Sequence, residues 1–118
     1  MQIEDRLEGN VLVVCPQEEA LDAYAAAGFR DRMVQLIQDG HRDIVLDLSH
    51  VHFLDSTGLG AIVSSLKRLE GNGVMVICRA GEMVMDVFRL TRMDRVFPIV
   101  SSLEDALQVA RRRMRDAA

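Results

Sequence analysis

One serine stands at a chemically informative position, in the stretch HFLDSTGLGAIVSSLKRL that covers residues 52–69. Asp55 precedes Ser56 and Thr57 follows it, at the point where an apolar strand pattern gives way to helical spacing. A hydroxyl at the start of a helix can cap the helix, act as a nucleophile, or accept a phosphate from another enzyme. The function of the chain depends on which of these tasks Ser56 has.

The residues around Ser56 give little support to a catalytic nucleophile. The strained turn that exposes a serine nucleophile requires Gly-x-Ser-x-Gly, and the residue two before Ser56 is Leu54. His50 and His52 precede the turn on a predicted strand, where they point to one side together, and this placement does not favour a Ser-His-Asp triad. We therefore expect the chain not to be a hydrolase, and turnover of an ester that is lost in Ser56→Ala would contradict this.

Three binding chemistries also find little support. His50 and His52 have no third and fourth metal ligand at suitable spacing, so we interpret them as partly exposed histidines at a strand end. Gly58-Leu59-Gly60 has neither the Gly-Lys-Ser/Thr ending of a phosphate loop nor a third glycine at the dinucleotide spacing. A phospho-aspartate receiver needs an acidic pair after VLVV, where Cys15 stands instead. We expect no cofactor and no metal.

The remaining interpretation from the residues alone is structural. Ser56 is predicted to be the N-cap of a helix that begins near Thr57, with its side-chain oxygen facing free backbone N–H groups. Gly58 and Gly60 do not fit this simple picture, because glycine in a helix costs about 1 kcal/mol relative to alanine. Two glycines in the first turn indicate that something large comes close. Capping and phosphate acceptance both stay open at this point.

The elements that position the turn follow from hydrophobic spacing. Residues 2–7 and 10–15 predict two strands joined by a hairpin at Gly9-Asn10. Further strands are predicted at 44–48, 74–78 and 96–100, and helices from Asp22 to Gly40, from Ser56 to Leu69, at 82–90 and after Ser101-Ser102, where a capping box stands. Pro98 suits an edge strand better than a central one. The order predicts an α/β fold: a mixed, mostly parallel β-sheet with an N-terminal antiparallel hairpin and about four helices. The Asp55-Ser56 turn then lies beyond the carboxyl end of a strand, where such sheets carry functional loops.

Composition narrows the class of protein. The chain has 118 residues, is 49% hydrophobic and carries a formal net charge of −4, which predicts one globular domain over residues 1–118. Residues 1–60 hold 11 acids and 4 bases, whereas residues 61–118 hold 7 acids and 10 bases. Such a dipolar chain can orient docking to a protein, but the acidic total argues against binding nucleic acid or an anionic membrane. We interpret Arg111 to Arg115 (RRRMR) as cations at a helix C-terminus.

Compartment is predicted from the cysteines and from the lack of targeting signals. Cys15 and Cys78 lie in the apolar runs VLVVCP and VMVICR, without a Cys-x-x-Cys spacing. The sequence has no signal-peptide pattern and no apolar run of membrane-spanning length. We expect buried, reduced thiols in a cytoplasmic protein.

The stretch VLDLSHVHFLDSTGLGAIVSSLKRL resembles the STAS-domain anti-sigma factor antagonists, the anti-anti-sigma factors of bacteria. The DSTGLG segment is the distinctive part. The likeness extends to Leu21-Asp22 at the first helix, to the Gly-Asn-Gly before a strand, and to the late Phe-Pro-Ile-Val followed by Ser-Leu-Glu-Asp-Ala. The resemblance covers essentially the whole chain and implies a STAS-like fold.

The resemblance also implies a function. Ser56 matches the serine that an anti-sigma factor serine kinase, an ATPase with a histidine-kinase-like fold, phosphorylates in this family. The unphosphorylated form binds the kinase and so releases a sigma factor, a PP2C-type phosphatase restores that form, and the antagonist itself is not an enzyme. The partner-binding residues that we predict on this basis are Asp22, Asp55, Ser56, Thr57, Gly58, Leu59 and Gly60, with Met83 and Met85 as adaptable apolar contacts.

One segment departs from the family pattern. Members commonly carry a glycine just before the Leu-Asp of the first helix, whereas this chain has Pro16-Gln17-Glu18-Glu19-Ala20, and the added acids alter a loop that usually lies near the partner. The alternative functions with the same fold are an interaction subunit of a stressosome-like scaffold or of a lipid-transport ABC system. A co-purified partner would distinguish them, and we expect no nucleic acid and no direct membrane insertion in any case.

Overall fold

The computed structural model of the chain describes residues 1–69 and 71–117. The elements within them are β1 (Ile3–Glu8), β2 (Val11–Pro16), β3 (Ala20–Leu21), α1 (Ala23–Gln38), β4 (Asp43–Asp47), β5 (Phe53–Leu54), α2 (Ser56–Leu69), β6 (Val74–Cys78), α3 (Glu82–Leu90), the 3-10 helix η1 (Met93–Arg95), β7 (Ile99–Val100) and α4 (Leu103–Ala117). None of the described helices is long and apolar enough to cross a membrane.

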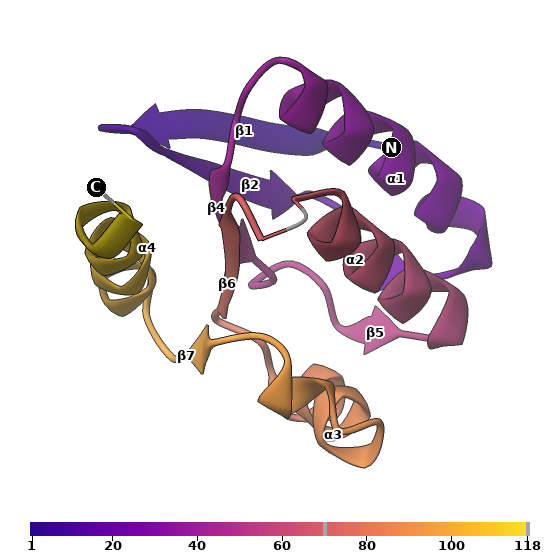
Figure 1. The fold of residues 1–118 in the computed structure, drawn as a ribbon. Coiled ribbons are helices and arrows are strands. Elements are labelled where there is room, and N and C mark those ends of the chain that lie inside the picture. Colours follow the sequence, from indigo (N-terminus) through magenta and orange to yellow (C-terminus); the bar gives the residue numbers. More distant parts are fainter. Residues whose placement is uncertain (70, 118) are drawn as a thin grey trace.

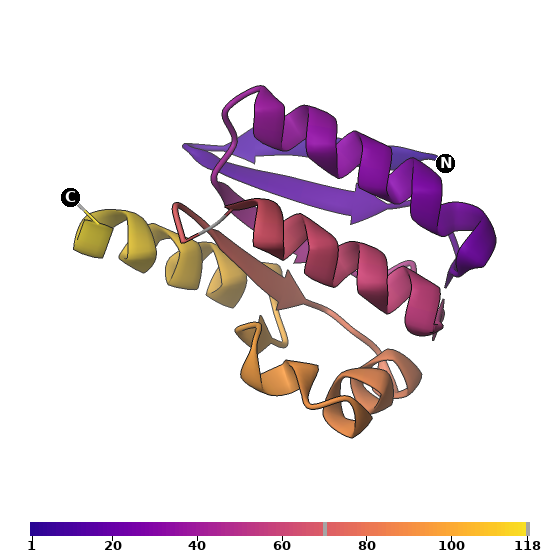
Figure 2. The same ribbon diagram turned by 45° about the vertical axis from the view of Figure 1, so that its right-hand side comes forward.

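Five strands form the central sheet, in the spatial order β1-β2-β4-β6-β7 (Figure 1). β1 runs antiparallel to β2, and every other pair of neighbours is parallel. In both views α1 and α2 lie side by side over one face of the sheet and α4 lies over the other face (Figure 2). The predicted α/β fold with its antiparallel hairpin and four helices is confirmed.

The central strand β4 is buried on both faces, as its compact apolar run predicts. Ile44 and Leu46 join the apolar cluster beneath α1 and α2, and Val45 joins the cluster beneath α4. Because side chains alternate along a strand, Asp43 and Asp47 lie on the same face as Val45, at the two ends of β4. The two carboxylates thus lie at opposite ends of the central strand.

Helix α1 begins and ends where the sequence predicts. Asp22 caps α1, because its carboxylate accepts hydrogen bonds from the amides of Tyr24 (3.0 Å) and Ala25 (3.1 Å). Gly40 follows the end of α1 with φ +105°, a backbone conformation that favours glycine. The apolar positions predicted to face the core are all buried: Ala26, Phe29, Met33, Leu36 and Ile37.

The C-terminal helix α4 is attached to the sheet by a cap and an ion pair. The Ser102 hydroxyl accepts a hydrogen bond from the Asp105 amide (3.1 Å), which confirms the predicted cap for this serine. Arg113 Nε lies 2.6 Å from Asp43 Oδ1, so one arginine of the RRRMR run holds α4 against β4 instead of serving only the helix end. The side chain of Arg115 lies outside the described residues.

Two predictions for short segments are wrong. Residues 96–100 form a strand only at β7, because Phe97 turns into the core and packs edge-on against Phe88, with ring centroids 6.0 Å apart. β7 is nevertheless an edge strand, which suits the neighbouring Pro98. His50 and His52 do not lie on a strand, since β4 ends at Asp47 and both histidines are exposed in the loop before β5.

A second, two-stranded sheet was not predicted. β3 pairs in parallel with β5, with Ala20 opposite Phe53 and Leu21 opposite Leu54. Both strands have only two residues, which is too short for a periodic hydrophobic pattern. This small sheet joins the segments that lead into α1 and α2, and it positions the candidate site.

Candidate functional site

The starts of α1 and α2 lie side by side, each following one strand of the small sheet. Because Leu21 stands opposite Leu54 in the parallel register, the next residues, Asp22 and Asp55, emerge next to each other. Each aspartate begins a helix. The small sheet therefore brings two of the predicted partner-binding residues together, although they are far apart in the sequence.

Asp55, and not Ser56, caps α2, so the predicted N-cap is wrong by one residue. Asp55 Oδ1 accepts a hydrogen bond from the Gly58 amide at 2.8 Å, and the Asp55 carbonyl accepts the first helical hydrogen bond from the Leu59 amide at 2.9 Å. A carboxylate satisfies an unpaired amide of the first turn as well as a hydroxyl does. Ser56 becomes the first residue of the helix itself.

Ser56 and Thr57 are both exposed at the start of α2. Among the described residues, the Ser56 hydroxyl makes no hydrogen bond that holds it to the rest of the chain. The amides of the first turn and the dipole of the helix place partial positive charge around it, which is favourable to an anion. The arrangement leaves a hydroxyl that a second protein can reach, on a helix end that tolerates a phosphate.

The two glycines of the first turn have different causes. A Cβ on Gly58 would stand 1.9 Å from the carbonyl oxygen of Leu21, so this position must be glycine for α2 to lie against β3. A Cβ on Gly60 would meet nothing within 4 Å. The large object expected from the sequence is thus the chain's own backbone at Gly58, while Gly60 is exposed and open. Leu59 between them is buried and fixes the helix to the core.

A groove of about 510 Å³ runs along the outer side of α2, starting at Ser56. Its other wall comes from the end of α3 and from η1. The lining residues are Ser56, Leu59, Gly60, Val63, Ser64, Lys67, Thr91 and Met93. Ser56 therefore opens onto a surface depression that continues down the helix.

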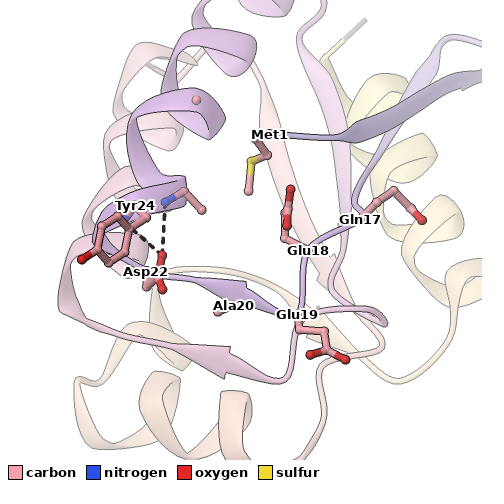
Figure 3. Close-up of a pocket in the computed structure, with 9 residues that line it drawn as sticks. Met1, Gln17, Glu18, Glu19, Ala20, Asp22 and Tyr24 are labelled. Atoms are coloured by element: carbon pink, nitrogen blue, oxygen red, sulfur yellow. Dashed lines mark hydrogen bonds between the residues drawn. The ribbon is translucent and has the colours of Figure 1, made fainter.

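A second depression, of about 570 Å³, lies beside the start of α1 (Figure 3). Glu18, Glu19 and Asp22 line it, together with Met1 and Tyr24 among others. The Glu19 carbonyl accepts hydrogen bonds from the amides of His52 (2.7 Å) and Phe53 (3.1 Å). The acidic segment that departs from the family pattern is therefore fastened to the segment that leads into Ser56.

Two exposed aromatic residues near the site were missed by the sequence reasoning. The side chain of Tyr24, at the start of α1, is 96% exposed, and that of Phe53 in β5 is 49% exposed. Exposed aromatic side chains are enriched where proteins bind one another. Phe53 was hidden in an apolar run that reads as core, and only the pairing of β5 at the surface distinguishes it.

The two methionines that we predicted to contact a partner differ in exposure. Met83 in the first turn of α3 is 68% exposed, whereas Met85 is half-buried, since Val84 and Phe88 form the buried side of this helix. α3 packs against β5 and so lies near the small sheet. Of the two, Met83 is the residue that can contact another protein without rearrangement.

Asp47, at the end of β4, connects the β4–β5 loop with the loop between β6 and α3. Its carboxylate is paired with Arg79 through Nε (3.2 Å) and Nη2, and it accepts a hydrogen bond from the Ser49 amide at 3.0 Å. Burial raises the pKa of Asp47, but the hydrogen bonds from Arg79 and Ser49 lower it by more, so the pKa lies below its ordinary value. Asp47 thus stays ionised.

The buried cysteines lie on either side of Asp47. Cys78 pairs with Asp47 in the β4–β6 register, and Cys15 follows Val14, which pairs with Leu46. Burial, and then the negative charge of Asp47, raise the pKa of Cys15 and raise that of Cys78 to about 12. Both cysteines are free thiols.

No group of three His, Cys, Asp or Glu side chains in the part of the chain that the structure describes is arranged to hold a metal ion. His50 and His52 are exposed residues of the β4–β5 loop.

The parallel sheet with its antiparallel hairpin, the two aspartate-capped helices and the exposed serine define a known class of domain. The STAS domain family model matches residues 2–106, and the chain belongs to that family. The anti-sigma-B factor antagonist of Staphylococcus aureus is 42% identical over 52 residues, which are 44% of this chain and 48% of that protein. The match to this relative therefore spans about half of its length.

Three solved structures of two proteins have the same fold. An anti-sigma factor antagonist from Mycobacterium paratuberculosis superposes with a TM-score of 0.86 at 25% identity, over 93% of each chain. SpoIIAA of Bacillus has been solved in unphosphorylated and phosphorylated forms, with TM-scores of 0.78 and 0.69 at 19% and 18% identity. These matches cover 93% and 91% of this chain, and 96% and 97% of SpoIIAA. The likeness to SpoIIAA concerns the fold alone.

Proposed function

We propose that the chain is an anti-sigma factor antagonist in the cytoplasm, and that its unphosphorylated form binds an anti-sigma factor serine kinase and so releases a sigma factor. Phosphorylation at Ser56 switches this binding off, and a PP2C-type phosphatase reverses it. The Staphylococcus and Mycobacterium relatives are both anti-sigma factor antagonists by name, which supports the general role. The observation that carries the switch is the exposed Ser56 hydroxyl, which the cap of α2 does not use.

The proposed switch acts on the surface and leaves the fold intact. A phosphate on Ser56 adds about −1.5 to −2 charges at a helix N-terminus, where an anion is favoured by about 0.3 to 1 kcal/mol. The helix therefore persists. The new charge stands one residue from the Asp55 carboxylate, in a surface where the partner had contacted a small neutral hydroxyl. Affinity falls because the partner's surface meets extra bulk and negative charge.

The proposed docking surface surrounds Ser56. Asp22 and Asp55 stand at its centre, with Thr57 and Gly60 beside the serine. Gly58 and Leu59 are buried, so their contribution is to shape the first turn of α2 and not to contact the partner. Met83 adds an exposed apolar contact from α3. In this role the chain binds and is modified, and it catalyses no reaction itself.

The proposal is tested by incubating the wild type with candidate histidine-kinase-like ATPases and ATP and mapping the phosphate by mass spectrometry. Ser56→Ala should take up no phosphate and keep kinase binding, and Ser56→Asp should weaken binding by about tenfold or more, since a charge then stands where the partner contacted a neutral hydroxyl. Thr57→Ala is the matched control and should still be phosphorylated at Ser56. Equal affinity of wild type, Ser56→Ala and Ser56→Asp would refute the switch, and phosphate on Thr57 alone would assign it to the next residue.

A further inference from the structure

The carboxylate of Asp47 connects two loops that approach the Ser56 surface from different parts of the chain. Its side chain is only 2% exposed at the carboxyl end of β4. The Ser49 amide belongs to the β4–β5 loop, and Arg79 belongs to the loop between β6 and α3. A backbone hydrogen bond from the Leu48 amide to the Cys78 carbonyl (3.0 Å) joins the same two segments.

Each loop leads directly to part of the proposed docking surface. After Ser49 the chain passes through residues 50–52 into β5 and then reaches Ser56. After Arg79 only two residues precede α3, whose first turn carries Met83. Asp47 therefore fixes the position of the serine segment relative to that of α3, although Asp47 itself is hidden from a partner.

The backbone at Arg79 is held in an unfavourable conformation. Its φ is +56°, in the left-handed region that is unfavourable for residues other than glycine. Such a conformation persists only where the surroundings enforce it. The bidentate contact of Arg79 with Asp47 is one interaction that enforces this conformation, and the Arg79 side chain remains 47% exposed.

Stability alone is a weak reason to keep this ion pair. Removing two charges from water offsets much of their attraction, so apolar residues at such sites are often equally stable. What an ion pair adds is a fixed geometry. Asp43 is also buried on β4, on the same face, and also pairs with an arginine, but at the opposite end of the strand.

We propose that Asp47 is a positioning residue that, through Arg79 and Ser49, holds the Ser56 segment and α3 in the one arrangement that the partner recognises. The partner's identity rests on the proposed function above, whereas the coupling of the two loops is a property of this chain alone. Asp47 contacts neither the phosphate nor the kinase. It acts through the loops that it joins.

The binding test compares Asp47→Asn and Arg79→Gln with the matched variant Asp43→Asn, using the kinase that phosphorylates the wild type. We expect each of the first two to weaken kinase binding about tenfold and the double variant to bind no worse than the weaker single one, because residues that act as one unit are not additive. Arg79→Lys should restore part of the affinity. Asp43→Asn should bind within about twofold of wild type, although it too removes a buried charge.

A second readout needs no kinase. Hydrogen exchange should accelerate in residues 49–56 and 80–86 of Asp47→Asn and Arg79→Gln, and not in Asp43→Asn, since a loosened loop exchanges through local opening. Arg79→Gln keeps the test valid if Asp47→Asn does not fold. If wild type binds no candidate kinase, the proposed function fails and the exchange pattern alone decides the positioning role. Equal exchange in the Asp47 and Asp43 variants, or equal kinase affinity, would overturn this inference and leave the function standing.

Discussion

Among single residues, Asp55 and Ser56 have separate roles at the start of α2. Asp55 is the N-cap and Ser56 is the proposed phosphate acceptor, although the sequence alone allows Ser56 to have both roles. Asp55 binds the Gly58 amide and holds the helix start, and Ser56 leaves its hydroxyl exposed. Aspartate and serine are about equally good N-caps, so the sequence could not decide which of two neighbours has the role. Because the cap is not the modified residue, phosphorylation does not remove it.

This division predicts unequal effects on stability. Asp55→Ala should lower the free energy of unfolding by about 1 kcal/mol, the usual loss for an N-cap, and Asp55→Asn by much less, because asparagine caps equally well. Ser56→Ala should change it by less than about 0.5 kcal/mol, as at an ordinary surface position. Urea unfolding of the three variants measures this. A loss in Ser56→Ala as large as that in Asp55→Ala would return the cap to the serine.

The two buried cysteines should be unreactive in the folded protein. Only the thiolate reacts readily, and Cys78, with its pKa raised to about 12, carries almost none at neutral pH. Cys15 and Cys78 also lie on strands separated by β4, about 10 Å apart, which is too far for a disulfide. Neither thiol should react with iodoacetamide in the native protein at pH 7, and both should react in urea, as counted by mass spectrometry. Rapid alkylation of the native protein would show that the sheet opens near the ends of β2 and β6, where the two cysteines lie.

At the scale of elements, the contact between α2 and β3 shapes the site. The Leu21 carbonyl approaches Gly58 so closely that the first turn of α2 rests on the small sheet. That contact fixes how closely the first turn of α2, which carries Ser56, approaches the small sheet. Gly60, two residues later, has no such neighbour and lines the groove along α2.

The two glycines should therefore respond in opposite ways to alanine. Gly58→Ala forces a Cβ into the Leu21 carbonyl and should destabilise the protein by about 2 to 3 kcal/mol, as overpacking does. Gly60→Ala meets no atom and should stabilise it by up to about 1 kcal/mol, because alanine is the better helix former. Thermal or urea unfolding of both variants gives the comparison. A stable Gly58→Ala protein would mean that β3 can move away from α2.

The elements that the sequence predicted well are those with enough residues to show a period. The helix that follows Asp22 and the apolar run of β4 repeat long enough for their buried faces to be read directly. β3 and β5 are two residues each, and their pairing depends on contacts between distant segments. For the same reason the sequence located the DSTGLG site but not Tyr24, Phe53 or the acidic depression beside it.

At the scale of the whole molecule, β4 runs through the centre of the sheet and carries a buried carboxylate at each end. Asp43 attaches the C-terminal helix through Arg113, and Asp47 attaches the two loops behind the Ser56 surface through Arg79 and Ser49. In the sequence the two acids only interrupt an apolar strand. Their arginine partners lie 70 and 32 residues further along the chain, so no local pattern could identify them.

The lowered pKa of Asp47 makes the stability of the whole fold depend on pH. Because the hydrogen bonds of Arg79 and Ser49 outweigh the effect of burial, folded Asp47 binds a proton less readily than the unfolded chain, in which its pKa is about 3.9. Its contribution to the free energy of unfolding is therefore fully present above the unfolded pKa and is lost as the pH falls through the folded pKa.

Asp47→Asn should accordingly be less stable than wild type by a constant amount between about pH 5 and pH 8, and the difference should shrink as the pH falls below about 4. Urea unfolding of wild type and Asp47→Asn across this range measures the difference directly, since all other titrating groups are shared. The result also shows whether burial or the contacts with Arg79 and Ser49 determine the pKa of Asp47. A difference that grew on acidification would mean that burial, and not the contacts with Arg79 and Ser49, controls this carboxylate, and the fixed arrangement of the two loops would lose its physical basis.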